Sequence, residues 1–254
     1  MSALAEAPGA ALRRRILSLA DTKRLLGIRY SDWLLGAPSI EDGIACSGMA
    51  QDEWGHARLL YALLKELDED PAPVEQDREP EAYVNAPALD APPETWEDVV
   101  ALMYAVDGAL TVALEGFGAG SFEVAAGRIP KMLDEERFHR DLAAAWVRRL
   151  AAGGEGREAL AGAVERILPA TLAWLAPADG VHAGLADAGL DAPAAGLEAR
   201  WLERIAPGLE ALGLEPPTRP TGGWDEARAR GPGAPDTEAV ERARGIRNRA
   251  LFVE

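Results

Sequence analysis

The chain has 254 residues, enough for one large domain or two small ones, and 48% of them are hydrophobic against 27% charged, which excludes a chain that is disordered throughout. Its 42 acidic and 26 basic residues give a formal net charge of -16, which disfavours nonspecific binding to nucleic acid and to anionic membranes. The single cysteine, Cys46, excludes an intramolecular disulfide, and the opening MSALAEAPGAALRRRILSLA lacks the apolar block of a signal peptide, so we expect a cytoplasmic protein.

Almost the whole chain is predicted to be helical. Alanine, leucine, glutamate and arginine dominate it, and its apolar residues recur at intervals of three and four positions. The first helix should run from about Ala10 to Leu35 and end in the helix-stopping sequence GAP. Ser39 is then a candidate N-cap for a second helix that reaches about Leu67. A proline-rich, acidic connection over residues 71–93 follows, and we expect it to be a surface crossover that spans the length of a bundle.

The third helix should begin at Thr95 or Trp96, carry VVALMYAVDGALTVALEGF and end at the glycines that follow. The fourth carries KMLDEERFHRDLAAAWVRRL, with Pro130 near its start as a possible kink. Two or three more helices should occupy residues 156–212, with His182 in an exposed loop that we expect to have no role. The predicted fold is an all-α four-helix bundle with a long crossover and additional C-terminal helices. Residues 1–215 should form this domain, and residues 216–254 an extension and short terminal helix that pack on it.

Two helices repeat a pattern that can bind a metal ion. Glu53 and His56 lie three positions apart and therefore project from one face of the second helix, and Glu136 and His139 repeat this spacing in the fourth. One such pair is weak evidence, but two of the three histidines of the chain occur in this pattern. Helical bundles that bind two iron or manganese ions use two such helices, together with one carboxylate from each of the remaining helices.

The third helix contains a suitable carboxylate. Asp107 lies in an apolar run in which Tyr104 is the only other ionisable side chain between Val99 and Leu114. A buried, unpaired carboxylate is costly, so Asp107 should contact a metal ion, a cation or a strong hydrogen-bond donor. The alternative is a purely structural aspartate that is hydrogen-bonded to a neighbouring helix.

The first helix departs from the four-carboxylate pattern. In an antiparallel hairpin, residues equally far from the turn lie at similar depth, and the residue that matches Glu53 across Pro38 is Lys23. Asp21 is two residues away, about 200° around the helix axis, and should point elsewhere. Three outcomes stay open. Lys23 is neutral and ligates one of two ions, it stays charged beside a single ion, or its ammonium group replaces the metal. Any metal should be iron or manganese rather than zinc.

Further residues of the same helices are candidates for supporting roles. Asp52 lies four residues before His56, and Glu135 four before His139, so each can hold the ring nitrogen that faces away from a metal, unless it faces solvent. Tyr30 lies seven residues after Lys23, and Tyr104 three before Asp107, so both are candidates to line the site, where a phenol near an oxidising metal can be redox-active. The alternative for both tyrosines is an ordinary place in the core.

Several segments together resemble the phenylacetic acid catabolic family, which includes the catalytic and structural subunits of the multicomponent phenylacetyl-CoA epoxidase. QDEWGH and the VDG around Asp107 are similar to the catalytic subunit, and LADTKRLLGIRYSDWLLGAP and RPTGG to the structural subunit, over roughly residues 15–230. The resemblance implies a ferritin-like di-iron fold. It also implies that the metal ligands are Glu53, His56, Asp107, Glu136 and His139, and that Lys23 stands where the catalytic members have a glutamate ligand.

Two functional hypotheses follow. In the first, the protein is a di-metal monooxygenase or oxidase with two iron or manganese ions, or one or none because of Lys23, that acts on a small molecule or CoA thioester in aromatic catabolism. In the alternative, it is a non-catalytic structural subunit of a multicomponent monooxygenase with a vestigial site. We expect a homo- or hetero-oligomer with related ferritin-like subunits and a reductase as a further partner, without nucleic acid or membrane binding. Metal storage is a weaker third interpretation, because ferritin-like cages are normally built from shorter chains without the extra C-terminal helices.

Overall fold

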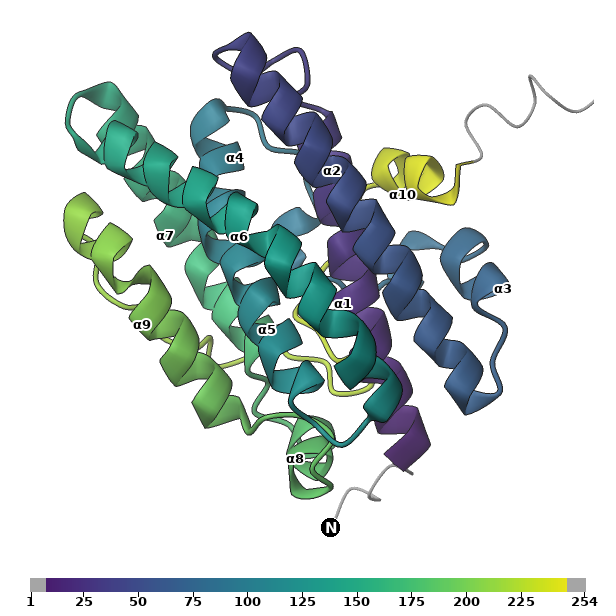
Figure 1. The fold of residues 1–254 in the computed structure, drawn as a ribbon. Helices are drawn as coiled ribbons and strands as arrows, with labels where there is room; N and C mark the ends of the chain where they lie inside the picture. Colours follow the sequence, from purple (N-terminus) through teal and green to yellow (C-terminus); the bar gives the residue numbers. More distant parts are fainter. Residues whose placement is uncertain (1–7, 246–254) are drawn as a thin grey trace, which may run out of the picture.

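The computed structural model describes residues 8–245, which form helices and turns without a β-strand (Figure 1). The predicted all-α, ferritin-like bundle is therefore confirmed. Its four core elements are two long helices from the N-terminal third, one interrupted helical run and one further long helix. These are α1 (Pro8–Ser31), α2 (Ile40–Tyr61), the run Trp96–Gly118 and α6 (Glu123–Ala151).

The α1–α2 hairpin follows the predicted signals with one difference. Ser39 is the N-cap of α2, as predicted, and its side chain accepts a hydrogen bond from the backbone N–H of Asp42 at 3.1 Å. The predicted first helix reaches Leu35, whereas α1 ends at Ser31. After Ser31 the backbone turns more tightly, because the N–H of Trp33 donates to the carbonyl of Tyr30, three residues back. The α-helix therefore ends before the sequence GAP. At its far end α2 continues as the short helix η1 (Ala62–Leu67).

Glycine is required where α2 begins to pass the end of α1. A Cβ atom at Gly43 would lie 2.2 Å from the carbonyl oxygen of Leu34, whereas a Cβ at Gly48, on the same helix, would meet nothing within 4 Å. We expect Gly43→Ala to lower the free energy of unfolding by about 1–3 kcal/mol, because the backbone must shift. Gly48→Ala should raise it by about 0.5–1 kcal/mol, because alanine loses less entropy in a helix. Urea denaturation of both variants measures this, and equal effects would contradict the close approach.

The third core element contains a π-helical turn that the sequence pattern does not predict. The run consists of α4 (Trp96–Ala101), the π-helical turn η4 (Leu102–Asp107) and α5 (Gly108–Gly118). Thr95 caps its start and forms a reciprocal capping box with Asp98, as the expected start at Thr95 or Trp96 requires. A π turn holds one extra residue per turn and changes the direction of the side chains that follow it. Asp107 is the last residue of this turn.

The predicted fourth helix corresponds to α6, which begins at Glu123 and contains Pro130 near its N-terminal end, as predicted. A proline inside a helix removes one backbone hydrogen bond without necessarily ending the helix.

The crossover is partly buried, which corrects the expectation of a surface connection. It contains α3 (Pro71–Gln76), η2 (Pro80–Ala82) and η3 (Pro87–Leu89), and residues 83–86 between η2 and η3 are buried. Asp21 of α1 holds this segment, because its carboxylate accepts hydrogen bonds from the backbone N–H of Val84 at 2.9 Å and from the hydroxyl of Tyr61 at 2.6 Å. Asp21 therefore points away from Lys23, as predicted.

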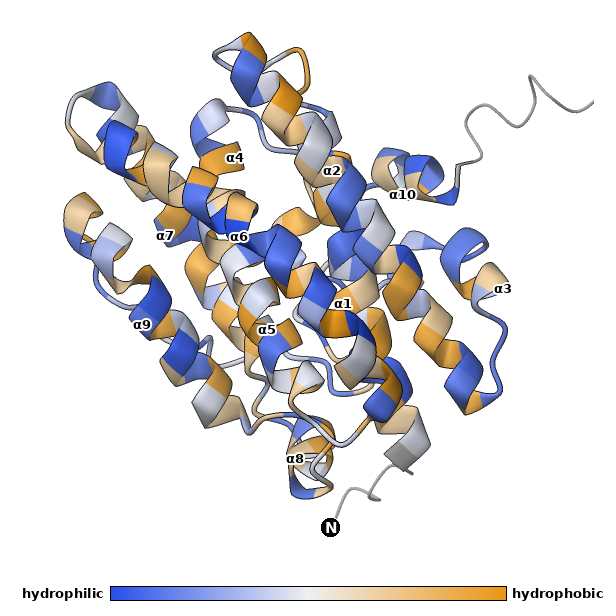
Figure 2. Ribbon diagram, viewed as in Figure 1, coloured by the Kyte–Doolittle hydropathy of each residue, from blue (hydrophilic) through white to orange (hydrophobic). Residues whose placement is uncertain are grey.

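The C-terminal part adds four helices around the bundle, which are α7 (Glu155–Leu175), α8 (Gly180–Asp187), α9 (Ala194–Leu212) and α10 (Thr237–Arg244). Helix α9 lies beside α5 and α6, and α10 contacts α1 and α3 (Figure 1). Figure 2 shows hydrophilic and hydrophobic positions interleaved along outer helices such as α9, the pattern of a helix that buries one face.

Within residues 8–245, one helical run is by itself long and apolar enough to cross a membrane, and α7 and α8 together pass the same test only as a pair bent by 53°. The single run is Trp96–Gly118, with 23 residues, and 83% of its most apolar window is buried inside the protein. This burial is that of a core helix, in agreement with the position of the run within the bundle (Figure 1).

His182 is buried in α8, so its predicted position in an exposed loop is wrong. Asp179 caps this helix by accepting the backbone N–H of His182 at 2.8 Å, and the imidazole Nε2 lies 3.1 Å from the carbonyl oxygen of Ala192, to which it donates. Burial, and secondarily the positive charge of Arg15, lowers the pKa of His182. The short helix was missed because its glycines and alanines resemble a loop.

A lowered histidine pKa makes stability depend on pH. Because the unfolded chain binds a proton at His182 more readily, the free energy of unfolding should fall as the pH drops through about 6.5, the ordinary histidine value. In His182→Gln this contribution is absent. Denaturation of both proteins between about pH 7.5 and about pH 5.5 should therefore show the smaller loss in the variant. An equal loss in the two proteins would contradict the lowered pKa.

Candidate metal centre

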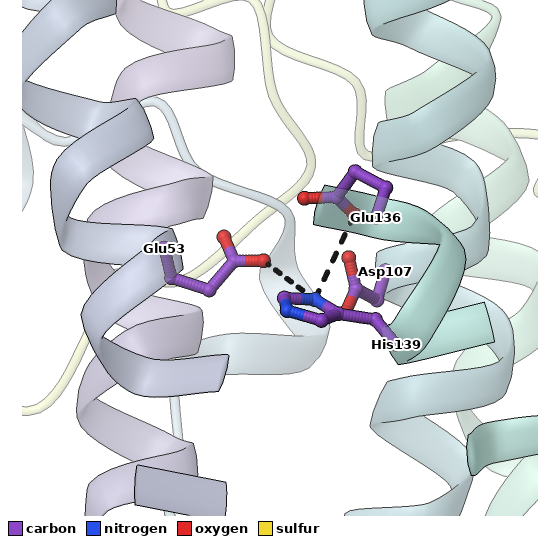
Figure 3. Close-up of side chains that lie close together, drawn as sticks. All are labelled: Glu53, Asp107, Glu136 and His139. Carbon is purple, nitrogen blue, oxygen red and sulfur yellow. Dashed lines mark hydrogen bonds and ion pairs between the residues drawn. The ribbon is translucent and has the colours of Figure 1, made fainter. Parts of the chain in front are cut away.

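The predicted site residues of four helical elements meet inside the bundle. Lys23 comes from α1, Glu53 and His56 from α2, Asp107 from η4, and the remaining pair, Glu136 and His139, from α6; all six side chains are at most 2% exposed. Figure 3 shows the three carboxylates and the ring of His139 directed toward one another. The apolar faces of these helices thus enclose a polar cluster in a region from which water is largely excluded.

Lys23 lies at the depth of Glu53, as the hairpin geometry predicts. Its Nζ atom is 2.8 Å from Glu53 Oε1, 2.6 Å from Glu136 Oε1 and 3.6 Å from Asp107 Oδ1. Burial alone would lower the pKa of Lys23, but the negative charges of Glu136, Glu53 and Asp107 together raise it above its ordinary value. The carboxylates around Lys23 thus favour its protonated form as long as no metal ion is bound.

The ring of His139 is directed from α6 toward the carboxylates of Asp107 and Glu53. Its Nδ1 atom lies 3.0 Å from Asp107 Oδ2, 3.4 Å from Glu53 Oε1 and 3.8 Å from Glu136 Oε2. One ligand atom from each of these four residues lies within 4.8 Å of the others, so this buried cluster could hold a metal ion. The mixture of carboxylates and imidazole suits iron or manganese.

His56 is adjacent but lies outside this group of four. Its Nδ1 is 3.2 Å from Glu136 Oε1, the same oxygen that contacts Lys23. Glu136 Oε1 thus lies between Lys23 and His56, whereas His139 approaches Asp107 and Glu53. The cluster is asymmetric because α1 contributes an ammonium group where the other three elements contribute carboxylates.

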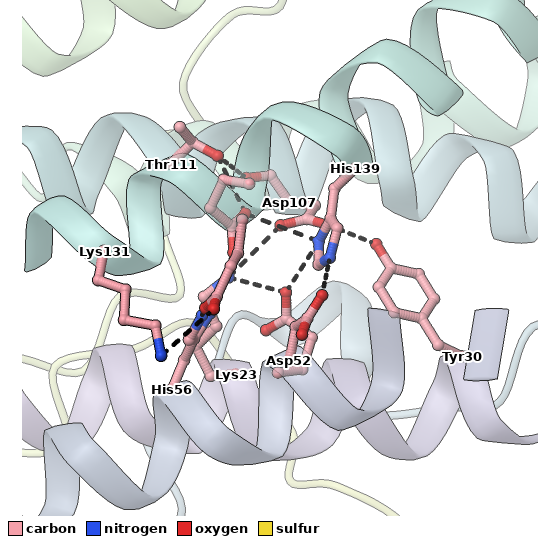
Figure 4. A network of polar contacts seen from close by, with 11 residues as sticks. Lys23, Tyr30, Asp52, His56, Asp107, Thr111, Lys131 and His139 are labelled. Carbon is pink, nitrogen blue, oxygen red and sulfur yellow. Dashed lines mark hydrogen bonds and ion pairs between the residues drawn. The ribbon is translucent and has the colours of Figure 1, made fainter. Parts of the chain in front are cut away.

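Asp52 and Glu135 have exchanged the partners that we predicted. Asp52 lies on α2 yet contacts His139 of α6, with 3.4 Å between Oδ2 and Nε2 (Figure 4). Glu135 of α6 contacts His56 of α2, with 2.7 Å between Oε2 and Nε2. Each outer ring nitrogen is directed toward the facing helix, so a carboxylate one turn back on the same helix does not reach it. Each carboxylate thus contacts an outer histidine nitrogen, but across the helix interface rather than along its own helix.

The two tyrosines have different positions. Tyr30 lies at the cluster, where its hydroxyl donates to Asp107 Oδ2 at 2.8 Å. Tyr104 does not line the cluster, because its hydroxyl donates to the backbone carbonyl of Ile205 in α9. The π turn directs Tyr104 outward, so its proposed place beside Asp107 is wrong. Sequence reasoning missed Thr111, whose hydroxyl contacts Glu136 Oε2 at 3.3 Å; its spacing of four residues from Asp107 is the signal that could have identified it.

The charges of the cluster are unevenly distributed. Burial raises the pKa of Glu53 to about 7 against the opposing effect of Lys23. Burial also acts to raise the pKa of Glu136, but the charge of Lys23 and the contact with His56 hold it well below its ordinary value. For His139, burial is outweighed by Asp107 and the other carboxylates, which raise its pKa to about 12. Without a metal, the carboxylates are therefore opposed by cations from the protein itself.

Two carboxylate oxygens of the cluster nevertheless lack a hydrogen-bond donor among the described residues. Glu53 Oε2 and Asp107 Oδ1 are buried oxygens that accept no hydrogen bond from the described residues. Buried carboxylate oxygens without a donor are costly, and a cation beside them removes this cost. The residues thus fit one ion, which would share the carboxylates of Glu53, Asp107 and Glu136 with the ammonium group of Lys23.

The comparison with known proteins agrees with the site. No protein of curated function matches the chain. Residues 2–231 match the family described as "Phenylacetic acid catabolic protein", nearly the whole chain including all residues of the cluster. The chain therefore belongs to the phenylacetic acid catabolic family, which supports a role in phenylacetate catabolism.

Proposed function

We propose that the protein is a cytoplasmic oxidoreductase of phenylacetate catabolism whose centre holds one iron or manganese ion beside the ammonium group of Lys23. The asymmetry of the cluster carries this proposal. Donor atoms of Asp107, His139 and the two glutamates lie within 4.8 Å of one another, and the ammonium group of Lys23 lies 2.6 Å from Glu136 and 2.8 Å from Glu53. The buried Cys46 is compatible with the reducing cytoplasm.

Charge balance supports a single ion. The carboxylates of Glu53, Asp107 and Glu136 carry three negative charges, and the ammonium of Lys23 leaves two, which one divalent ion neutralises. The same count would leave two divalent ions with an excess of positive charge in a buried site, which is unfavourable.

The side chains have separate roles in this proposal. Glu53, Asp107, Glu136 and His139 would hold the ion, and iron or manganese would supply dioxygen activation. Tyr30 orients the carboxylate of Asp107 through its hydrogen bond, and Asp52 orients the ring of His139 from α2. Lys23 supplies the second positive charge. Electrons would come from a reductase, the substrate would be a small molecule or CoA thioester, and the protein would work with related ferritin-like subunits.

Metal analysis tests the proposal. Protein purified from medium with added iron and manganese should contain about one equivalent of metal by mass spectrometry, as one divalent ion balances the cluster. Glu136→Gln should lose it. Glu165→Gln, at an exposed position of α7, is the matched control and should keep it. About two equivalents in the unmodified protein would contradict the role of Lys23, and none would contradict the metal centre.

A non-catalytic structural subunit is the second candidate, and one specific observation favours it. The ammonium group of Lys23 lies between 2.6 and 3.6 Å from an oxygen of each of the three central carboxylates. In that case the ammonium replaces the ion, and the cluster only stabilises the bundle. Absence of metal from the unmodified protein, together with binding to a metal-containing relative in gel filtration, would select this candidate.

A further inference from the structure

A cleft of about 340 Å³ lies between η4, α6 and α9, on the outer side of the helices that form the metal centre. Its apolar lining includes Met103 from η4, Val147 from α6 and Ile205 from α9. The volume falls within the roughly 300–1,000 Å³ of small-molecule sites, which combine mainly apolar walls with a few polar groups. None of the residues that we assign to the metal lines this cleft.

Close packing of η4 against α9 forms one wall of the cleft. A Cβ atom at Gly208 would lie 2.3 Å from the hydroxyl oxygen of Tyr104, so only glycine lets the aromatic ring lie against α9. Trp201 strengthens the contact by donating from Nε1 to the carbonyl of Ala105 in the π turn at 3.1 Å. Small residues of α6, Ala143 and Ala144, leave the opposite side open. The cleft is therefore held between fixed walls.

The rim is basic in a protein whose net charge is -16. Its charged residues are Arg140, Arg148, Arg204 and one acidic residue, Asp141. Arg204 pairs with Glu115 at 2.9 Å, and Arg140 lies 3.5 Å from Asp141. Within residues 8–245, Arg148 is exposed and has no carboxylate partner, so its guanidinium is available to a ligand.

We propose that this cleft binds a medium-chain carboxylate, with its hydrocarbon chain against Met103, Val147 and Ile205 and its carboxylate at Arg148. The charge of the rim selects an anion, since a neutral apolar molecule would gain nothing from the guanidinium. The apolar walls select a hydrocarbon body, since a bare inorganic anion would leave them exposed to water. This site is separate from the proposed function and needs no metal.

Calorimetric titration of the full-length protein with octanoate, and with octan-1-ol as its uncharged counterpart, tests the proposal. Octanoate should bind saturably and more tightly than octan-1-ol. Arg148→Gln should weaken octanoate about five-fold, as expected for an exposed charge pair, and leave octan-1-ol unchanged. Arg149→Gln is the matched control, because this guanidinium stacks on the Trp146 ring, 4.6 Å from its centroid, and does not line the cleft.

A second variant examines the apolar walls. Ala144→Trp should fill the cleft and abolish binding of both compounds, and a near-UV circular dichroism spectrum with preserved sign and shape of the bands shows that the variant is folded. The proposal is overturned if octanoate does not saturate the unmodified protein, if octan-1-ol binds equally well, or if Arg148→Gln and Arg149→Gln weaken octanoate to the same extent.

Discussion

Lys23→Met is expected to lower the free energy of unfolding of the metal-free protein by about 3–5 kcal/mol, the cost of removing one partner from a buried ion network. Lys23 is fully buried, and its Nζ lies within 2.8 Å of Glu53 and Glu136. Methionine keeps most of the volume but leaves these carboxylates without the ammonium group that lies closest to them. Guanidinium denaturation in the presence of a chelator measures the effect.

The loss of unfolding free energy caused by Lys23→Met should increase with pH. The pKa of Glu53 is already raised to about 7, and loss of the ammonium would raise it further above its value in the unfolded chain. A folded-state carboxyl pKa above the unfolded one makes stability fall as the pH rises, so the loss should be greater at about pH 8 than at about pH 6. A loss independent of pH would contradict this coupling between Lys23 and Glu53.

Lys131→Met is the matched control for charge and side-chain type. Lys131 is 79% exposed and lies 3.7 Å from Glu135, so its removal should change the free energy of unfolding little. Surface pairs of this kind contribute about 0–1 kcal/mol. If both lysine variants lost the same amount, the cluster would not depend on the ammonium of Lys23.

Lys23→Glu has the largest expected effect on the metal centre, raising the metal content from about one to about two equivalents as a fourth carboxylate joins the cluster. The new carboxylate would lie on the side of His56. The Nδ1 atom of His56 is buried, and among the described residues it has no hydrogen-bond partner, although Glu136 lies 3.2 Å away. That imidazole can then serve the second ion. Mass spectrometry of the metal content, with both metals supplied during growth, gives the result.

Lys23→Gln separates the effect of a new ligand from the loss of a charge. It removes the ammonium without adding a carboxylate, so its metal content should stay at one equivalent or below. If Lys23→Glu also stayed at one equivalent, the His56 side would be unable to hold an ion even with four carboxylates, and the asymmetry would have a cause other than the charge of Lys23.

The sequence could place some site residues together, whereas the contacts of others differ from the prediction. Glu53, Asp107, Glu136 and His139 could be brought together from the sequence, because helical spacing and apolar surroundings place each of them on a buried face. Asp52 could be selected as a supporting residue, but its partner was wrong, since the distance between two helices decides which ring it reaches. Tyr104 was misplaced for a related reason, because the π turn directs its side chain toward α9.

The sequence by itself determined the helical class, the order of the core helices, the caps at Ser39 and Thr95 and the position of Lys23 opposite Glu53, because these depend on local spacing and on the symmetry of one hairpin. Only the tertiary structure decided the exchanged contacts of Asp52 and Glu135, the burial of His182 and the cleft beside Arg148. These features arise where side chains of different helices meet. Their geometry depends on the separation and rotation of whole helices, which short-range sequence patterns do not encode.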